Sequence, residues 1–243
     1  MKIYKSITKF CTYFRNQISI INEIQINPSV FQHTDYENNQ IRFYKKVLLL
    51  TAIDTLAGIR FPKARYPQLN KRNQERFIKF MVESKSWPDG KLVSIPFLAE
   101  HLKTGKIPKG KLSELVSSLT ANYFEDGVFN IPVALIDLPI ESLLELVTTE
   151  QEEIILRENQ HYELLYRYRN YLIHESREPG NAMEISPEDN PYYHGYIGDP
   201  KLYLAYPLGL FLNAAALAVD YIEKYLTDNA LDPYDFVTET TRW

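Results

Sequence analysis

The chain has 243 residues, of which 45% are apolar and 24% are charged, a composition typical of a soluble globular protein with one large domain or two small ones. A formal net charge of −4 provides no general attraction to nucleic acid, so any anion-binding site must be a local patch. The one cysteine, Cys11, excludes a disulfide framework and a cysteine-based zinc site, and it favours a reducing compartment. Because Cys11 falls on the apolar stripe of the first predicted helix, we expect it in the core.

The first third of the chain shows three helical patterns. Apolar residues recur at spacings of three and four over residues 3–21, which predicts a long amphipathic helix that ends at Asn27-Pro28-Ser29. A second helix is predicted over residues 36–59, and because it is apolar on nearly all sides we expect it in the middle of the fold. A third helix, over residues 70–84, follows a proline-bounded loop.

Shorter patterns occupy the middle of the chain. Residues 95–103 and 111–123 each predict a short helix, and a further helix is expected near Pro139, because proline suits a first helical turn. The longest predicted helix covers residues 150–175 and ends before Pro179-Gly180.

The last part of the chain is predicted to fold back before a final helix. Residues 181–201 are rich in proline, glycine and tyrosine, which predicts a long ordered loop or one small β-hairpin. A last helix is predicted over residues 206–226. No internal repeat or linker is visible. The sequence therefore predicts one all-α, mainly helical domain over residues 1–243, with residues 228–243 as a peripheral tail.

The segment 202–219 is the most apolar stretch, but Pro207, Gly209 and Asn213 interrupt it and Asp220 follows directly. We therefore predict a buried helix rather than a membrane span. The first residues lead into an amphipathic helix rather than an apolar signal region, so no signal peptide is expected. A cytoplasmic protein without membrane contact is the resulting expectation.

The most specific motif is Arg169-Asn170-Tyr171-Leu172-Ile173-His174, which places a cation, an amide and an imidazole on about one and a half turns of helix. Positions four apart share a face, so two faces are predicted. The apolar face consists of Leu164, Leu165, Tyr168 and Leu172, and the polar face of Glu163, Arg167, Asn170 and His174. A polar face of this kind is either solvated or part of a site that a second subunit completes.

Arg169 falls at the edge of the apolar face, where an unpaired guanidinium is costly. Asp54 has the matching problem, because it lies within the predicted apolar second helix. We therefore predict that Asp54 and Arg169 approach each other and that the carboxylate orients the guanidinium.

Arg-Asn-x-x-x-His near the end of a long helix resembles the signature of the HEPN superfamily, an arginine followed by a polar residue, three others and a histidine. Asp54 and, more loosely, Glu75-Arg76-Phe77 are similar to features of some HEPN groups. The resemblance implies an up-down helical bundle, here with extra N-terminal and inserted helices, that forms homodimers whose motifs meet across the interface. It also implies a metal-independent endoribonuclease with a role in toxin–antitoxin systems, antiviral defence or RNA processing, and with RNA and an antitoxin or regulatory protein as partners.

In the chemistry that this resemblance implies, His174 accepts the 2′-hydroxyl proton of RNA, Arg169 holds the scissile phosphate, and Asn170 donates to the phosphate or fixes the imidazole. The products carry a 2′,3′-cyclic phosphate and a 5′-hydroxyl, and neither a metal nor a cofactor takes part. Three alternatives stay open. A catalytically inactive HEPN-like module could bind RNA, a nucleotide or a partner protein. Arg169 could form a structural ion pair while His174 caps its helix. The motif could also be coincidental in a helical scaffold protein.

A basic segment lies between positions 60 and 79, where seven cations stand against a single acidic residue, Glu75, with Phe61 and Tyr66 interleaved. The cations are Arg60, Lys63, Arg65, Lys71, Arg72, Arg76 and Lys79. Such a segment suits the backbone of single-stranded RNA with stacked bases, or it is a solvated surface. We predict RNA contacts from Arg60, Lys63, Arg65, Arg72 and Arg76.

Other chemistry has weaker support. Gly105 to Lys111 satisfies the first part of a P-loop, but Leu112 stands where magnesium binding needs serine or threonine. His161 and His174 are thirteen residues apart and fall on different faces, so no zinc site is predicted. His194 follows the motif helix within a tyrosine-rich loop, where it is either an exposed loop histidine or a second, supporting proton-transfer group.

Overall fold

The computed structural model describes residues 2–27, 29, 37–123, 130–179, 184, 189–195 and 201–236. It is mainly helical with small antiparallel sheets, which confirms the predicted fold class at that level. The chain divides into two compact units, a first unit of Met1–Trp87 with Leu208–Trp243 and a second unit of Pro88–Pro207. The single domain and the peripheral tail stay predictions.

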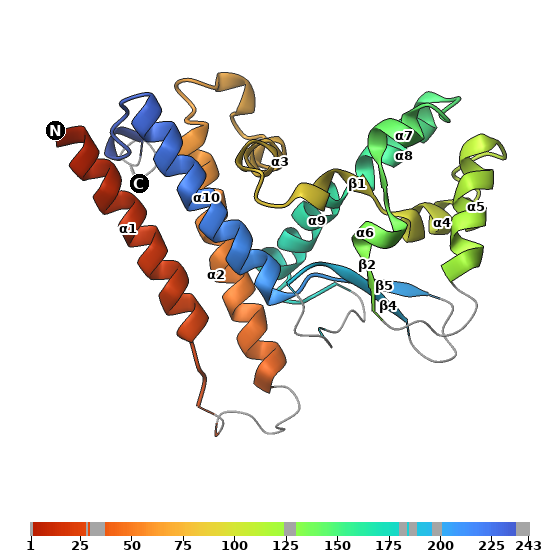
Figure 1. Ribbon diagram of the computed structural model, residues 1–243, viewed down its shortest axis with the longest axis horizontal. Coiled ribbons are helices and arrows are strands. Elements are labelled where there is room, and N and C mark those ends of the chain that lie inside the picture. Colours follow the sequence, from red (N-terminus) through yellow and green to blue (C-terminus); the bar gives the residue numbers. More distant parts are fainter. Residues whose placement is uncertain are drawn as a thin grey trace. The chain divides into compact units, whose positions relative to one another are not determined.

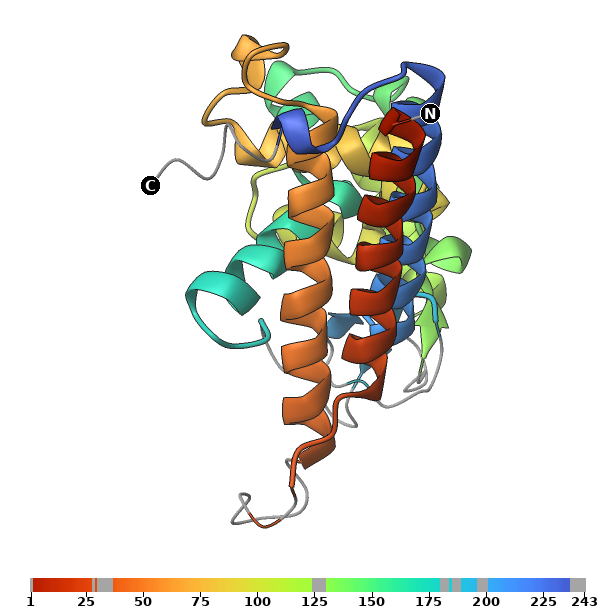
Figure 2. The same ribbon diagram turned by 90° about the vertical axis from the view of Figure 1, so that its left-hand side faces the viewer.

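Three long helices of the first unit, α1 (Lys2–Glu23), α2 (Glu37–Arg60) and α10 (Leu208–Asp228), lie side by side (Figures 1 and 2). Helix α3 (Asn73–Ser84) packs against α2 and α10 and follows a short 3₁₀ helix, η3 (Pro67–Leu69). These bounds confirm the predicted first, second, third and last helices to within about three residues at each end.

Helix α1 uses its apolar stripe for this packing, and its buried residues are Ile7, Phe10, Cys11, Phe14 and Ile21. Cys11 is fully buried, which confirms the core position, and burial raises the pKa of its thiol to about 12. On the polar side, Arg15 joins α1 to α10 through Asp220 at 2.7 Å and Glu223 at 2.5 Å.

Helix α2 is not buried on all sides as predicted. Leu49 and Ile53 are in the core, but Leu48 is 42% exposed and Thr51 faces solvent. The exposed side of α2 borders α1 along an apolar groove that also contains Phe14 and Ile20. The prediction overlooked that a helix at the edge of a small bundle keeps one side free.

The second unit is built from short elements. In chain order they are η4 (Pro88–Lys91), β1 (Leu92–Val93), α4 (Ile95–Lys103), α5 (Lys111–Tyr123), β2 (Ile131–Pro132), α6 (Val133–Ile136), β3 (Leu138–Pro139), α7 (Ile140–Leu144), α8 (Glu150–Glu158), α9 (His161–His174), β4 (Tyr192–Gly195) and β5 (Leu202–Ala205). Helices α4 and α5 have the predicted bounds, and α7 begins directly after Pro139 as expected.

Two small antiparallel sheets belong to this unit. Strands β4 and β5 pair with Tyr192 opposite Ala205 and His194 opposite Tyr203, and β2 pairs with the other edge of β4. A small hairpin is therefore present, but only its first strand lies in the predicted range 181–201, because β5 begins at Leu202. Residues 196–200 between the strands lie outside the described residues. The second sheet, β1 with β3, was not predicted.

The longest predicted helix, over residues 150–175, is wrong as one element, because it is divided into α8 and α9. Asn159 ends α8 by bonding its side-chain amide back to the carbonyl of Ile155 at 2.8 Å. Gln160 is then extended, with ψ 145°, and pairs with Val93 of β1. The break between α8 and α9 thus lets Gln160 pair with the edge of β1, a contact that helical periodicity cannot reveal.

A buried carboxylate holds the second unit together. Asp137 Oδ1 accepts from the backbone N–H of Ile95 at 2.9 Å, at the start of α4. Its Oδ2 lies 2.6 Å from His161 Nε2, at the start of α9, and accepts from the Tyr193 hydroxyl on β4 at 2.6 Å. Ser94, the N-cap of α4, lies 2.6 Å from the same hydroxyl. One side chain therefore anchors α4, α9 and β4 to each other.

The apolar stretch 202–219 is divided between β5 and α10. No helix within the described part of the chain is long and apolar enough to cross a membrane.

Candidate functional site

The predicted motif lies at the C-terminal end of α9, whose last residue is His174. The helix ends there because Ser176 turns into the left-handed region at φ 53°, and the N–H groups of Glu175 and Arg177 both donate to the Tyr171 carbonyl, at 3.1 and 3.4 Å. Asn170 and His174 are one turn apart on this last stretch.

The side chains of the motif converge. Arg169 Nη1 donates to Asn170 Oδ1 at 2.9 Å and lies 3.4 Å from His174 Nε2. The guanidinium carbon of Arg169 is also 5.5 Å from the ring centre of Tyr166, one turn earlier. Arg169, Asn170 and His174, named the RNH cluster below, thus place a cation, an amide and an imidazole within contact of each other.

The two predicted faces of the motif helix are confirmed. The four apolar residues are all buried, whereas Arg167 and His174 are exposed and Glu163 and Asn170 are partly buried. Arg169 is partly buried, as expected for a residue at the edge between the faces.

The contacts of the RNH cluster define what it can bind. A guanidinium only donates hydrogen bonds, so a neutral imidazole with its proton on Nδ1 can accept from Arg169 at Nε2. An anion that takes the place of this contact would be held by Arg169 and would lie directly beside Nε2. The cluster therefore combines an anion-binding donor with a group that can accept a proton.

Asp54 lies on α2 in the first unit and is partly buried, whereas Arg169 belongs to the second unit. The predicted approach of these two residues stays a prediction.

His194 is not an exposed loop histidine. It lies on β4, is fully buried, and stacks on the Tyr203 ring at 5.9 Å between centres. Burial lowers the pKa of the His194 imidazole and so favours its neutral form. A supporting role in proton transfer stays a prediction.

The basic segment belongs to the first unit, where it follows α2 and continues into α3. Arg60 points into the unit, with Glu83 at 2.7 Å and with the hydroxyls of Tyr66 and Tyr221 at 2.8 and 2.9 Å. Its guanidinium also stacks on Tyr225, 4.2 Å from the ring centre.

The other predicted RNA contacts lie nearer the surface. Lys63 and Arg65 are exposed, Arg76 is partly buried, and Arg72 is exposed with its guanidinium 3.2 Å from Glu75. RNA contacts from this segment stay a prediction. Arg60 differs from the other cations because its guanidinium pairs with Glu83 inside the first unit.

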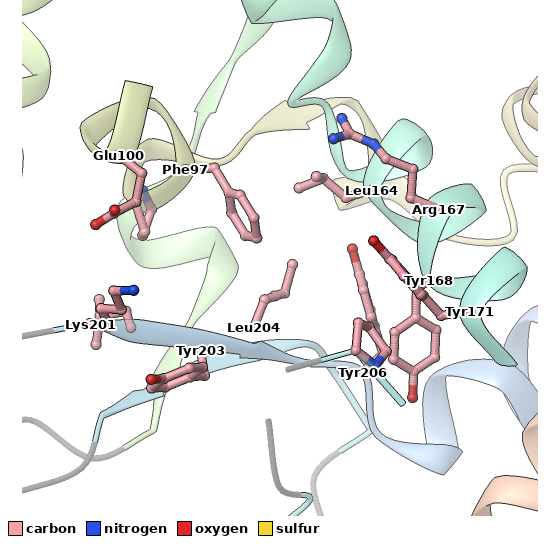
Figure 3. A pocket seen from close by; sticks show the side chains of 13 residues that line it. Phe97, Glu100, Leu164, Arg167, Tyr168, Tyr171, Lys201, Tyr203, Leu204 and Tyr206 are labelled. Atoms are coloured by element: carbon pink, nitrogen blue, oxygen red, sulfur yellow. The ribbon is translucent and has the colours of Figure 1, made fainter. Parts of the chain in front are cut away.

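A pocket of about 370 Å³ lies in the second unit, along the side of α9 next to the polar face (Figure 3). We name it the tyrosine pocket. It is lined by Pro96, Phe97, Glu100, Leu164, Arg167, Tyr168, Tyr171, Pro179, Lys201, Leu202, Tyr203, Leu204 and Tyr206. Helix spacing does not predict this pocket, because it does not show that β5 and the residues around it lie against α9.

The tyrosine pocket is bounded by packed apolar and aromatic side chains. The rings of Tyr168 and Tyr206 meet edge to face at 5.0 Å between centres. Burial raises the pKa of both hydroxyls well above the usual value, so both stay protonated. Phe97 from α4 and Leu204 from β5 point toward each other across the middle of the pocket (Figure 3).

Among the residues that the structure describes, no group of three or more His, Cys, Asp or Glu side chains could hold a metal ion. No family model, curated protein or solved structure matches the chain. A functional assignment therefore depends on the motif, its geometry and the surrounding chemistry.

Proposed function

We propose that the protein is a metal-independent endoribonuclease of the HEPN type, a helical bundle that acts on RNA as a homodimer. The observation that carries this proposal is the convergence of the motif, with Arg169 Nη1 2.9 Å from Asn170 Oδ1 and 3.4 Å from His174 Nε2. A helix places residues i, i+1 and i+5 at different angles, so their contact requires side chains that turn toward one point. The exposure of His174 supports access by a large substrate.

In the proposed reaction, Arg169 and Asn170 hold the non-bridging oxygens of a phosphodiester and offset the charge that builds on them. His174 takes the proton of the neighbouring 2′-hydroxyl. The 2′-oxygen then forms a bond to phosphorus, and the bond from phosphorus to the 5′-oxygen breaks. The leaving oxygen takes a proton from water or from the imidazole of the second subunit, which gives a 2′,3′-cyclic phosphate and a 5′-hydroxyl.

The test is cleavage of labelled single-stranded RNA and tRNA in EDTA. Wild type should cut, and His174→Ala should lose cleavage by about two to four orders of magnitude, the range for removal of a positioned acid–base group. His101→Ala is the matched control, because His101 lies on α4 of the same unit and outside the RNH cluster. Loss of cleavage in both variants, or in neither, would contradict the proposal.

In a toxin or antiviral-defence role, expression of the wild type should slow the growth of the host cell, and His174→Ala should restore it. Equal growth inhibition by wild type and variant would show that the toxicity does not depend on the RNH cluster. A folded protein that binds RNA without cutting it would instead support the catalytically inactive HEPN-like module.

A further inference from the structure

The tyrosine pocket and the RNH cluster share one helix. Tyr171 lines the pocket and His174 follows three residues later, which corresponds to about 4.5 Å along the axis and about 60° around it. Arg167, also in the pocket lining, precedes His174 by two turns on nearly the same face. Of the RNH cluster, His174 is therefore the residue nearest to the pocket on the surface of α9, whereas Arg169 lies about 200° around the helix from Tyr171 and reaches His174 through its side chain. A nucleotide with its base against Tyr171 would have to extend past His174 to place its phosphate at the cluster.

The lining of the pocket favours a flat ring with an anionic substituent. Phe97, Tyr171 and Tyr203 contribute rings on which a planar molecule can stack, and the buried rings of Tyr168 and Tyr206 complete the aromatic lining. The described charges in the lining are Arg167, Lys201 and Glu100, which is a net positive set. Two of these charges have other partners, since Glu100 pairs with Lys103 at 2.8 Å and Arg167 donates to the backbone carbonyl of Glu158.

The tyrosine rings and part of the charged lining lie at opposite ends of the pocket. Three tyrosines, Tyr168, Tyr171 and Tyr206, gather at the end of the pocket formed by α9, and Lys201 lies at the opposite end with Glu100 (Figure 3). A volume of about 370 Å³ is at the small end of the range for ligand pockets, which suits a single nucleotide rather than a longer segment.

We propose that the tyrosine pocket takes the base of the nucleotide next to the scissile phosphate, so that the identity of this base decides where the RNA is cut. This inference rests on the proposed endoribonuclease function. Stacking alone tolerates every base, whereas a pocket with walls on several sides limits ring size and the positions of exocyclic groups. The tyrosine pocket therefore acts as the specificity site, and the RNH cluster carries out the reaction.

The test is binding of short RNA in which every 2′-hydroxyl is methylated, so that the strand binds but cannot react. Labelled tetranucleotides of each base composition are titrated with wild type and with Leu204→Trp, which places a large ring in the middle of the pocket. Wild type should prefer one base composition, and Leu204→Trp should weaken that binding about tenfold or more. Ile154→Trp is the matched control, because Ile154 is an exposed apolar residue on α8 of the same unit and outside the pocket.

A second pair of variants covers the case in which Leu204→Trp does not fold. Lys201→Glu reverses an exposed charge of the pocket, and Lys109→Glu makes the same change at an exposed position outside it. Lys201→Glu should weaken tetranucleotide binding and raise KM in RNA cleavage more than it lowers kcat, and Lys109→Glu should leave both unchanged.

The outcomes separate this inference from the proposed function. Cleavage that stays intact in Leu204→Trp and Lys201→Glu, with the same base preference as wild type, would overturn the specificity site and leave the endoribonuclease standing. Base-selective binding that both variants abolish, in a protein that cuts no RNA, would support the base pocket and contradict the endoribonuclease. Binding without any base preference would overturn the specificity site.

Discussion

The buried carboxylate of Asp137 offers a sharp test of how the second unit is held together. Asp137→Ala removes the acceptor of three contacts, from the Ile95 N–H at 2.9 Å and from His161 and the Tyr193 hydroxyl at 2.6 Å each. His161 is fully buried, so water cannot readily replace its lost acceptor, whereas the Tyr193 hydroxyl keeps Ser94 Oγ at 2.6 Å. Each unsatisfied buried donor costs roughly 1–3 kcal/mol, so we expect a loss of about 3–5 kcal/mol in the free energy of unfolding of this unit.

The assay is urea denaturation followed by circular dichroism, with hydrogen exchange to assign the loss to residues 88–207. Tyr193→Phe is the matched variant, because it removes one hydroxyl from the same network and should cost only about 1 kcal/mol. Asp137→Ala should also loosen the tyrosine pocket, since Asp137 anchors α4 and α9, which both line it. A loss for Asp137→Ala no greater than for Tyr193→Phe would refute the argument that this carboxylate is the anchor.

Four further substitutions test local features of the two units. Thr149→Ala removes the capping box of α8 and should lower stability by about 1 kcal/mol in thermal denaturation. Burial raises the pKa of Glu152, but hydrogen bonds from Thr148 and Thr149 outweigh burial and hold the pKa below its usual value of 4.5. The contribution of this carboxylate to stability is therefore complete above about pH 4.5 and is lost as the pH falls through the lower folded pKa. The difference in stability between wild type and Glu152→Gln should shrink over the same pH range. Gly90→Ala places a methyl group against the Tyr162 ring and should cost about 1–3 kcal/mol, which unchanged hydrogen exchange in α9 would disprove. Arg60→Met leaves a partly buried carboxylate without its cation in the first unit and should lower the urea midpoint, whereas Arg72→Met, at an exposed pair, should not.

Helical periodicity predicted much of the fold. It located α4 at its observed bounds and placed the buried and exposed faces of the motif helix correctly, because both follow from local spacing. It joined α8 and α9 in error, since the break at Asn159 and Gln160 depends on pairing with Val93, more than sixty residues earlier.

In the candidate site too, the part formed within one helix could be predicted and the part formed by distant segments could not. The RNH cluster was predictable, because all three of its residues lie on one helix. The tyrosine pocket was not, because its lining comes from α4, α9 and the residues around β5, which only the folded chain brings together. His194 was expected on a loop and lies buried on β4, where strand pairing opposite Tyr203 determines its surroundings.

The most direct test of the central claim uses the substrate rather than the protein. An RNA strand is first mapped for its cut site with the wild type in EDTA, and the same strand is then prepared with a single 2′-deoxynucleotide on the 5′ side of that bond. In the proposed reaction the RNH cluster acts through the 2′-hydroxyl, so we predict that this strand resists cleavage at the site while the all-RNA strand yields a 2′,3′-cyclic phosphate end. Cleavage of the deoxy-substituted bond, or a requirement for a divalent metal ion, would contradict the account.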